Sequence, residues 1–238
     1  MADATPAALG YRWPAEWERH AATWLAWPHN PETWPRRLER AEDACVGLLR
    51  ALQEHETVRL LVGDEALEDR ARRRLSAGGV DADRAIEFHR IPTDDAWLRD
   101  SGPIFVTRGD GRGGSERAIL DFRFDCWGRK YARWDRDDAL PRAIAAALGL
   151  PRFRADFVLE GGSIDGNGAG TILTTESCLL HPNRGSGRSR EAMERRLADW
   201  LGATNVLWLR EGIAGDDTDG HIDDIARFVA PGTVVASV

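Results

Sequence analysis

The densest group of residues that could do acid–base chemistry lies near the end of the chain, in the segment GDDTDGHIDD at residues 215–224. His221 stands two residues before Asp223, so on a strand the two side chains would share one face. A histidine close to carboxylates can stay protonated at neutral pH and serve as a general acid or base. A solvated, Asp-rich turn is the more common structure for this composition, so the segment alone leaves both interpretations open.

Two further segments carry isolated acids next to turn residues. In WLRDSGP, residues 97–103, Asp100 precedes a Gly-Pro turn, and Trp97 offers an aromatic face to a cation or an alkyl chain. In LEGGS, residues 159–163, Glu160 is followed by two glycines that let the backbone approach another element closely. The plain alternatives are a buried tryptophan with a turn-capping aspartate, and a glutamate on a solvent-facing turn.

Together these segments supply several carboxylates and one imidazole, a set that suits a guanidinium group. A guanidinium is planar and permanently charged, and a carboxylate can accept two of its N–H groups at once. We therefore expect two carboxylates to hold the cation while the histidine transfers protons. Such chemistry also needs a nucleophile for the guanidinium carbon, and a low-pKa thiolate would serve.

The same residues match metal sites poorly. A zinc site built from His181, His221 and Asp223 lacks the closely spaced histidine pairs of zinc proteins, and a calcium loop over residues 215–224 fails on the spacing of its acids. We expect no metal and no other cofactor. The cysteines form neither a CxxC pair nor a disulfide pattern; they are Cys45, Cys126 and Cys178.

The composition is that of an ordinary globular protein and argues against several classes of partner. The chain has 238 residues, of which 42% are hydrophobic and 30% charged, so it can bury a core. Its net charge of −7 argues against a nucleic-acid-binding surface. The sequence contains no apolar run long enough to predict a membrane span and no signal-peptide pattern at its start. We therefore expect a cytoplasmic protein that binds neither nucleic acid nor membrane.

The elements that must position these residues follow a repeating order of strand, acidic loop, two strands and a helix. The acidic loops are centred on Asp100, Glu160 and His221, at intervals of 60 and 61 residues. Equivalent loops of stacked or radial modules meet at one place, so residues distant in sequence would form a single site. The alternative is an ordinary mixed α/β sheet with three surface loops. Strands are expected over 23–27, 57–62, 86–91, 104–107, 117–124, 156–159, 171–174, 178–181, 206–209, 226–229 and 233–238, and helices over 34–55, 65–77, 137–148 and 189–201.

The last of these strands, residues 233–238, has no stop signal after it. An unclosed edge is a hazard for a natural domain, so we expect the complete protein to continue beyond this point.

In their order along the chain, the motifs resemble those of agmatine deiminases and the related bacterial-type peptidyl-arginine deiminases, of the guanidino-group-modifying superfamily. The resemblance implies an α/β fold, specifically a fivefold pseudo-symmetric α/β-propeller, of which residues 1–238 would form a single incomplete catalytic domain without the last modules. The matching segments are RWPAEW at 12–17, WLAWP at 24–28, WLRDSGP at 97–103, LEGGS at 159–163, TTESCLLHPNR at 174–184 and DDTDGHID at 216–223.

The resemblance also implies a role for each candidate residue. Asp100 and Asp223 would grip the guanidinium. His221 would be the general acid and base, and Glu160 would hold and polarise it. Two substrate-binding residues would be Trp97, packing along the substrate, and Asp217, in contact with agmatine.

The implied reaction converts agmatine to N-carbamoylputrescine and ammonia, a step of putrescine biosynthesis, through a cysteine amidino-thioether. The family's nucleophile is a cysteine in a Gly-rich segment near the C-terminus, and none of the 238 residues matches it. Cys178 lies in a segment that the family uses structurally, so we do not assign it this role.

Three other functions and a question of assembly stay open. A peptidyl-arginine deiminase would share the fold but would usually be exported. A non-catalytic protein could bind guanidines without converting them, and a metal-dependent hydrolase could use His221 and Asp223. A homodimer is compatible with the sequence.

Overall fold

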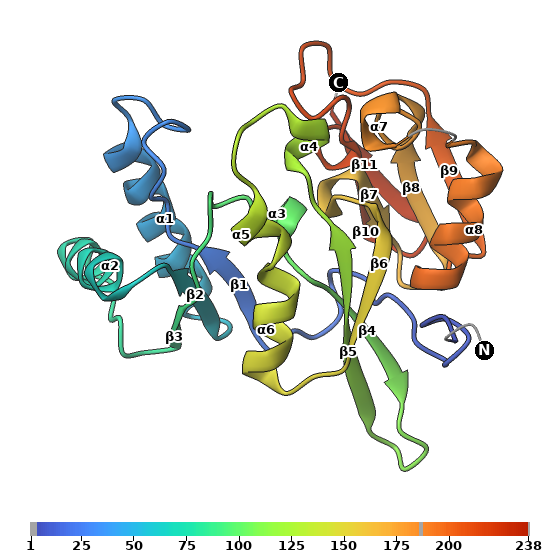
Figure 1. The fold of residues 1–238 in the computed structure, drawn as a ribbon. Helices are drawn as coiled ribbons and strands as arrows, with labels where there is room; N and C mark the ends of the chain where they lie inside the picture. Colours follow the sequence, from blue (N-terminus) through green and yellow to red (C-terminus); the bar gives the residue numbers. More distant parts are fainter. Residues whose placement is uncertain (1–3, 186–187, 238) are drawn as a thin grey trace. The chain divides into compact units, whose positions relative to one another are not determined.

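The computed structural model describes residues 4–185 and 188–237, which form two compact units (Figure 1). Unit 1 contains the residues up to Glu18, then Arg99–Ala132, then those from Pro141 onward. Unit 2 contains Arg19–Leu98 and Arg133–Leu140. The single catalytic domain expected over 1–238 stays a prediction.

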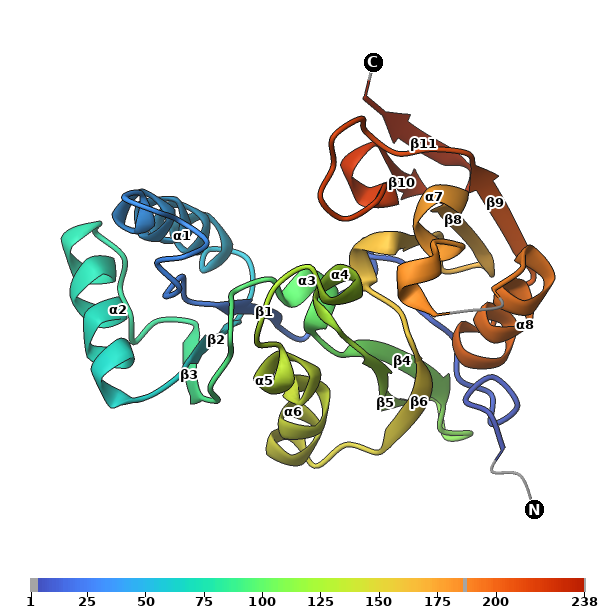
Figure 2. The same cartoon turned by 45° about the horizontal axis from the view of Figure 1, so that its top comes forward.

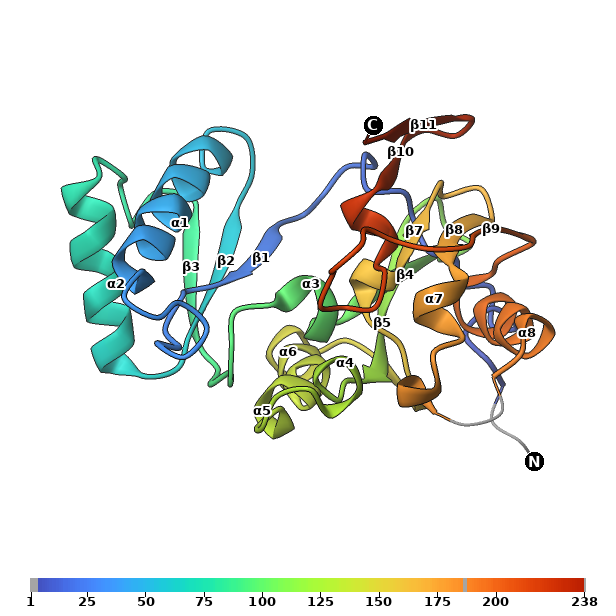
Figure 3. The same cartoon turned by 90° about the horizontal axis from the view of Figure 1, so that it is seen from above.

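Unit 2 is a parallel three-stranded sheet with two helices on one face. Strands β1 (Thr23–Ala26), β2 (Val58–Val62) and β3 (Ile86–Arg90) pair in that order. They are connected through α1 (Leu38–Leu52) and α2 (Glu65–Ala77). Both helices lie on the same face of the sheet (Figure 3), as right-handed crossovers between neighbouring parallel strands require. The core between them includes Trp27, Leu49, Leu60 and Leu75, and the unit also contains the short helix α5 (Asp135–Asp138).

Unit 1 begins with a hairpin to which a third strand is added. Strands β4 (Ile104–Gly109) and β5 (Ser115–Arg123) are antiparallel, and β6 (Arg152–Val158) pairs parallel to β5. The return from β5 to β6 includes the short α4 (Cys126–Arg129) and α6 (Leu140–Leu148). This sheet is the first module of the unit.

A second sheet repeats this topology. Strands β7 (Ile164–Gly166) and β8 (Thr171–Thr175) form a hairpin, and β9 (Asn205–Leu209) pairs parallel to β8. The helices of this module are α7 (Glu176–Leu179) and α8 (Arg190–Leu201). A further antiparallel hairpin, β10 (Ala226–Ala230) and β11 (Thr233–Ala236), starts the next module beside α7 and β8 (Figure 2). The shared order of hairpin, helix and parallel strand supports the repeat expected from the sequence.

One hydrophobic core joins the two three-stranded sheets of unit 1. Phe122 and Phe157 lie 5.3 Å apart between ring centroids, and Trp200 of α8 packs on both. Leu179 and Met193 are fully buried in the same cluster. The strand ends that carry the acidic turns are therefore anchored on one packed body.

Several expected elements differ from the structure. The strand expected over 178–181 is wrong, because Thr175 caps a helical turn there and accepts a hydrogen bond from Cys178 N at 3.2 Å. The helix expected over 34–55 begins only at Leu38, after Arg36 adopts a left-handed φ of +60°. Strand β7 and the short helices α3 (Leu98–Ser101) and α4 were not expected. The strand expected over 233–238 ends at Ala236, and Val238 lies outside the described residues.

No helix in the described part of the chain is long and apolar enough to cross a membrane.

Candidate active site

Three turns of unit 1 bring the expected acid–base residues together. Asp100 lies on α3, Glu160 follows β6 at the start of the 3-10 turn η1 (Gly161–Ser163), and His221 precedes the 3-10 turn η3 (Ile222–Asp224). Their exposed fractions are 9%, 0% and 2%. The modules therefore converge on one buried group, as their spacing predicts.

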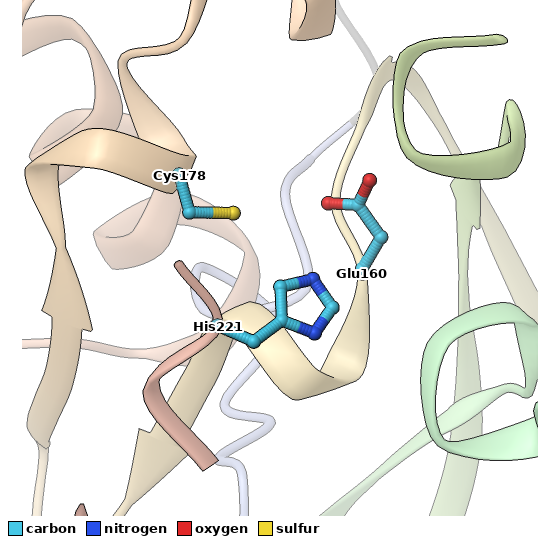
Figure 4. A group of neighbouring side chains, drawn as sticks. All are labelled: Glu160, Cys178 and His221. Atoms are coloured by element: carbon cyan, nitrogen blue, oxygen red, sulfur yellow. The ribbon is translucent and has the colours of Figure 1, made fainter. Parts of the chain in front are cut away.

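The imidazole of His221 faces carboxylates on both sides. Its Nδ1 lies 3.5 Å from Asp100 Oδ1 and 3.9 Å from Asp223 Oδ1. Its Nε2 lies on the opposite side of the ring, which faces Glu160 (Figure 4). The expectation that His221 and Asp223 share one face of a strand is wrong, because η3 begins directly after His221 and its tight turn folds Asp223 back toward the ring.

Asp100 is held rigidly by two donors. Its Oδ2 accepts from Trp127 Nε1 at 3.0 Å, and its Oδ1 accepts from the backbone N–H of Gly162 at 3.0 Å. A Cβ at Gly162 would lie 2.4 Å from His221 Nδ1 and 2.6 Å from Asp100 Oδ1. Only glycine lets the backbone pass this close to the ring, which confirms the close approach expected from the LEGGS segment.

The turn before His221 is fixed by Asp216. Its Oδ2 accepts from the backbone N–H groups of Gly220 at 2.8 Å and His221 at 3.1 Å, and its Oδ1 accepts from Thr218 N at 2.9 Å. Gly220 has a φ of +105°, a conformation that favours glycine. The DDTDGH segment is thus a tight turn held by hydrogen bonds within the segment, and it places the imidazole of His221 in the interior.

Burial dominates the electrostatics of the carboxylates. It raises the pKa of Asp100 to about 7, and the nearby Glu160 and Asp223 add to this effect. It also raises the pKa of Asp223, although the positive charge of Arg99 opposes the change, with Arg99 Nε 3.4 Å from Asp223 Oδ2. Both carboxyl groups therefore ionise less readily than in water, and a bound cation would favour their ionised forms.

The imidazole responds in the opposite direction. Burial, followed by the positive charge of Arg184, lowers the pKa of His221 to about 3. Of the two charge states that the sequence allows for His221, the lowered pKa favours the neutral one in the protein without substrate. A neutral imidazole is ready to accept a proton, as a general base must.

Glu160, Cys178 and His221 point toward one another in Figure 4, with one nitrogen, oxygen or sulfur atom of each within 4.8 Å of the others. Among the described residues, Glu160 Oε2 and His221 Nε2 are buried without a hydrogen-bond partner. Of the residues that the structure describes, this group, rather than the His181 set considered above, has possible ligand atoms close enough to one another to hold a metal ion.

Cysteine, histidine and glutamate are zinc ligands, but the surroundings of this group favour another interpretation. Burial, reinforced by the charge of Glu160, raises the pKa of Cys178 well above its ordinary value. Glu160 Oε1 already accepts from Arg184 Nε at 2.9 Å. A metal ion would have to displace a thiol proton beside a guanidinium, so we interpret the group as hydrogen-bonding partners of His221.

The structure does not test the two expected substrate-binding residues, Asp217 and Trp97. Asp217 is exposed in the turn before His221, and its carboxylate accepts from the hydroxyl of Tyr131. No hydrogen bond or ion pair of the described residues joins Asp217 to Asp100 or His221. Trp97 belongs to unit 2, where its ring lies 5.8 Å from that of Trp34. Their contacts with a substrate stay predictions.

Sequence reasoning missed the groups that hold the acids in place. Trp127 donates to Asp100, and Arg184 pairs with Glu160 across 24 residues of sequence. Arg99, the residue before Asp100, forms ion pairs with Glu16 and Asp223. The one available signal was that Arg184 closes a matched segment, TTESCLLHPNR, which is otherwise largely uncharged.

Comparisons with known proteins point to one family. The model of a family described as Porphyromonas-type peptidyl-arginine deiminase matches residues 12–238. The agmatine deiminase of Pseudomonas aeruginosa is 41% identical in an alignment that covers 97% of this chain and 61% of that relative. The structure of Enterococcus faecalis agmatine deiminase aligns with a TM-score of 0.89 at 35% identity, covering 99% of this chain and 63% of that one.

A C. jejuni agmatine deiminase with substrate bound aligns with a TM-score of 0.83 at 29% identity, covering 95% of this chain and 64% of that one. The chain therefore spans less than two thirds of the length of the relatives that it matches.

Proposed function

Because the chain belongs to the Porphyromonas-type peptidyl-arginine deiminase family, we propose that its buried acid–base site binds agmatine for conversion to N-carbamoylputrescine and ammonia in the complete protein. For the complete fold we propose a fivefold α/β-propeller, in which the hairpin–helix–strand modules of unit 1 would form part of the ring. In this proposal the protein works in the cytoplasm on a step of putrescine biosynthesis.

One observation carries the proposal: two buried carboxyl groups, Asp100 and Asp223, lie next to the imidazole of His221. Asp100 and Asp223 approach His221 Nδ1 to 3.5 and 3.9 Å. A guanidinium bound by both carboxylates would offset the burial that raises their pKa values. It would also bring its reacting carbon next to the imidazole.

The reaction follows from this placement. The nucleophilic thiol gives its proton to neutral His221 as its sulfur adds to the guanidinium carbon. His221 then delivers this proton to the nitrogen that leaves as ammonia, and an amidino-thioether remains. Water then attacks that carbon while neutral His221 accepts its proton, and the thiolate leaves. The balance is agmatine plus water giving N-carbamoylputrescine plus ammonia.

The thiolate itself comes from outside the 238 residues in this proposal. Cys178 lies beside His221, but burial holds its pKa far above that of an activated nucleophile. We therefore place the nucleophile in the remaining length of the relatives. Trp97 and Asp217 complete the proposed site as contacts for the alkyl chain and the amine of agmatine.

The binding half of the proposal can be tested with the chain itself. Isothermal titration with agmatine should show one site, and Asp100→Asn or Asp223→Asn should weaken binding at least about tenfold, because each removes a charge-assisted contact. The exposed neighbour Asp224 is the matched control, and Asp224→Asn should leave the affinity unchanged. Equal losses in all three variants, or no binding by the unsubstituted chain, would refute the site.

The catalytic half needs a protein in which these residues are joined to the remaining length of the relatives. Release of ammonia and N-carbamoylputrescine from agmatine is the expected activity. His221→Ala should lower kcat by about a hundredfold or more, the usual contribution of a general acid or base. A near-normal rate in this variant would remove the proposed role of His221.

The family description itself favours a second candidate, peptidyl-arginine. The two substrates share the guanidinium and differ at the other end, where peptidyl-arginine carries a peptide chain in place of the amine. Competition between agmatine and a peptide ending in arginine separates them, and we expect agmatine to win.

A further inference from the structure

Arg184 is a buried cation beside the site, and each of its guanidinium nitrogens donates a hydrogen bond. Its side chain is fully buried, and Nε donates to Glu160 Oε1 at 2.9 Å. Its Nη2 donates to the carbonyl of Thr218 at 2.7 Å, and its Nη1 to Asp219. Arg184 therefore connects the carboxylate on one side of His221 to the turn that presents His221.

The turn is held at Asp219 by more than Arg184. Asp219 has a left-handed φ of +69°, and its carboxylate also accepts from Lys130 Nζ at 2.7 Å and from Asn183 Nδ2 at 2.8 Å. These bonds fix the main chain just before His221. The distinctive contribution of Arg184 is thus its contact with Glu160, which no other contact of the turn supplies.

Glu160 has one oxygen occupied and one free. Oε1 accepts from Arg184, while buried Oε2 lacks a partner among the described residues, as does His221 Nε2. Burial raises the pKa of Glu160, and the charge of Arg184 opposes that change. One carboxylate oxygen of Glu160 lies within 4.8 Å of one ring nitrogen of His221, and Oε2 is the acceptor that remains to pair with Nε2.

The protonation of Glu160 decides which nitrogen of His221 is the base. An ionised Glu160 can only accept, so a neutral His221 beside it must carry its proton on Nε2. Nδ1 is then unprotonated on the side of Asp100 and Asp223. A protonated Glu160 would instead donate to Nε2, and the proton of the imidazole would move to Nδ1, where it would block the base.

We propose that Arg184 is a positioning residue that selects the Nε2–H form of neutral His221 by keeping Glu160 a hydrogen-bond acceptor. The inference rests on the acid–base role of His221 in the proposed function, and it adds a residue to which no role was assigned. Arg184 acts through Glu160 and needs no contact with the substrate.

The test reads the proton position directly, in the 238-residue chain and without agmatine. Nitrogen-15 NMR of the histidine ring distinguishes a protonated from an unprotonated nitrogen, and the spectrum of His221→Ala identifies the signals of His221. At neutral pH we expect a protonated Nε2 and an unprotonated Nδ1. A protonated Nδ1 in the unsubstituted chain would overturn the inference.

Glu160→Gln provides a nearly isosteric variant. Because Arg184 can only donate, the new amide must turn its oxygen to Arg184 and its NH₂ group to His221. The proton of the imidazole should therefore move to Nδ1. An unchanged spectrum would show that the residue at position 160 does not set the proton position.

Arg184→Met removes the cation, and Glu160 should then bind a proton and shift the His221 proton to Nδ1. Arg184→Gln keeps a polar donor near the Thr218 carbonyl and carries the same test if the methionine variant does not fold. Arg188→Met is the comparison variant, because Arg188 interacts with Glu160 through its charge but donates its hydrogen bonds to the carbonyls of Val158 and Leu179. It shows how much of the effect comes from losing a nearby charge without the direct bond. The inference fails if folded Arg184 variants retain the protonated Nε2.

The result is separable from the proposed function. Agmatine binding by the unsubstituted chain tests the function, whereas the ring spectra test Arg184 without any ligand. Normal agmatine binding together with unchanged spectra in the Arg184 variants would overturn only the role of Arg184.

Discussion

At Asp100, the same burial that prepares a cation site also makes binding depend on pH. The pKa of Asp100 is raised to about 7, and that of Asp223 is raised as well. In the proposed site the guanidinium of agmatine binds the ionised carboxylates, so a protonated site must release its proton first. Below about pH 7 the affinity should rise with pH, by up to about tenfold per unit for each proton released, and should level off above it.

Isothermal titration in buffers of different ionisation enthalpy measures this linkage. The observed enthalpy should reveal proton release near pH 6 and almost none near about pH 8.5, where Asp100 is already ionised. Asp100→Asn should flatten the profile as well as weaken binding. An affinity that is constant between about pH 5.5 and 8 would contradict the raised pKa of Asp100.

For individual residues, the sequence predicted which side chains meet in the site but not their proton affinities. Asp100, Glu160, His221 and Asp223 each stand in a short motif with turn residues, and the structure brings all four together. Their proton affinities were not predictable, because burial, which depends on the fold, lowers the pKa of His221 and raises that of Asp100. The pairing of Arg184 with Glu160 also depends on the fold, since nothing local relates a residue of η2 (Pro182–Arg184) to the end of β6.

At the scale of elements, the turn η1 serves as the spacer between the acid and the base. Gly162 donates to Asp100, and a Cβ there would come within 3.0 Å of Asp223 Oδ2 besides its clashes with His221 and Asp100. Gly162→Ala should therefore push these side chains apart. We expect a loss of agmatine affinity of at least about tenfold and a loss of stability of about 1–3 kcal/mol.

Gly109→Ala is the matched control, because a Cβ at Gly109 meets no atom within 4 Å. Titration and thermal unfolding of the two variants separate a local obstruction from a general glycine effect. Similar affinities in both variants would show that the close approach at Gly162 is not needed for binding.

Elements were predictable where their boundaries are local. Helix α2 was expected over 65–77 and is found as Glu65–Ala77, because Asp64 caps it and Gly78 ends it. The strand prediction for residues 178–181 failed because the short apolar run has no period that distinguishes a strand from a helical turn. The side chain of Thr175 caps the turn and so favours it. Local caps therefore outweighed the apolar pattern.

At the scale of the whole molecule, the sequence predicted the repeat of the modules. It did not predict the division of the chain into two units. The interval between the acidic loops reflects the modules of unit 1, in which β4–β6 and β7–β9 share one topology. Unit 2 departs from it, since β1, β2 and β3 are all parallel. Residues 133–140 belong to unit 2 although they follow a strand of unit 1, a long-range assignment that no local pattern encodes.

The location of the site within unit 1 predicts where agmatine will slow hydrogen exchange. A ligand at 100 times its Kd stabilises the bound form by about 2.7 kcal/mol, so amides that exchange by opening of the site should slow by up to about a hundredfold. Mass spectrometry should show this protection around Asp100, Glu160 and residues 216–224.

Strand β2 of unit 2 (Val58–Val62) serves as the internal control, because it carries none of these residues. Uniform protection of both units would contradict a site built from the turns of unit 1, whereas protection of the peptide containing Trp97 would support the substrate contact proposed for that residue.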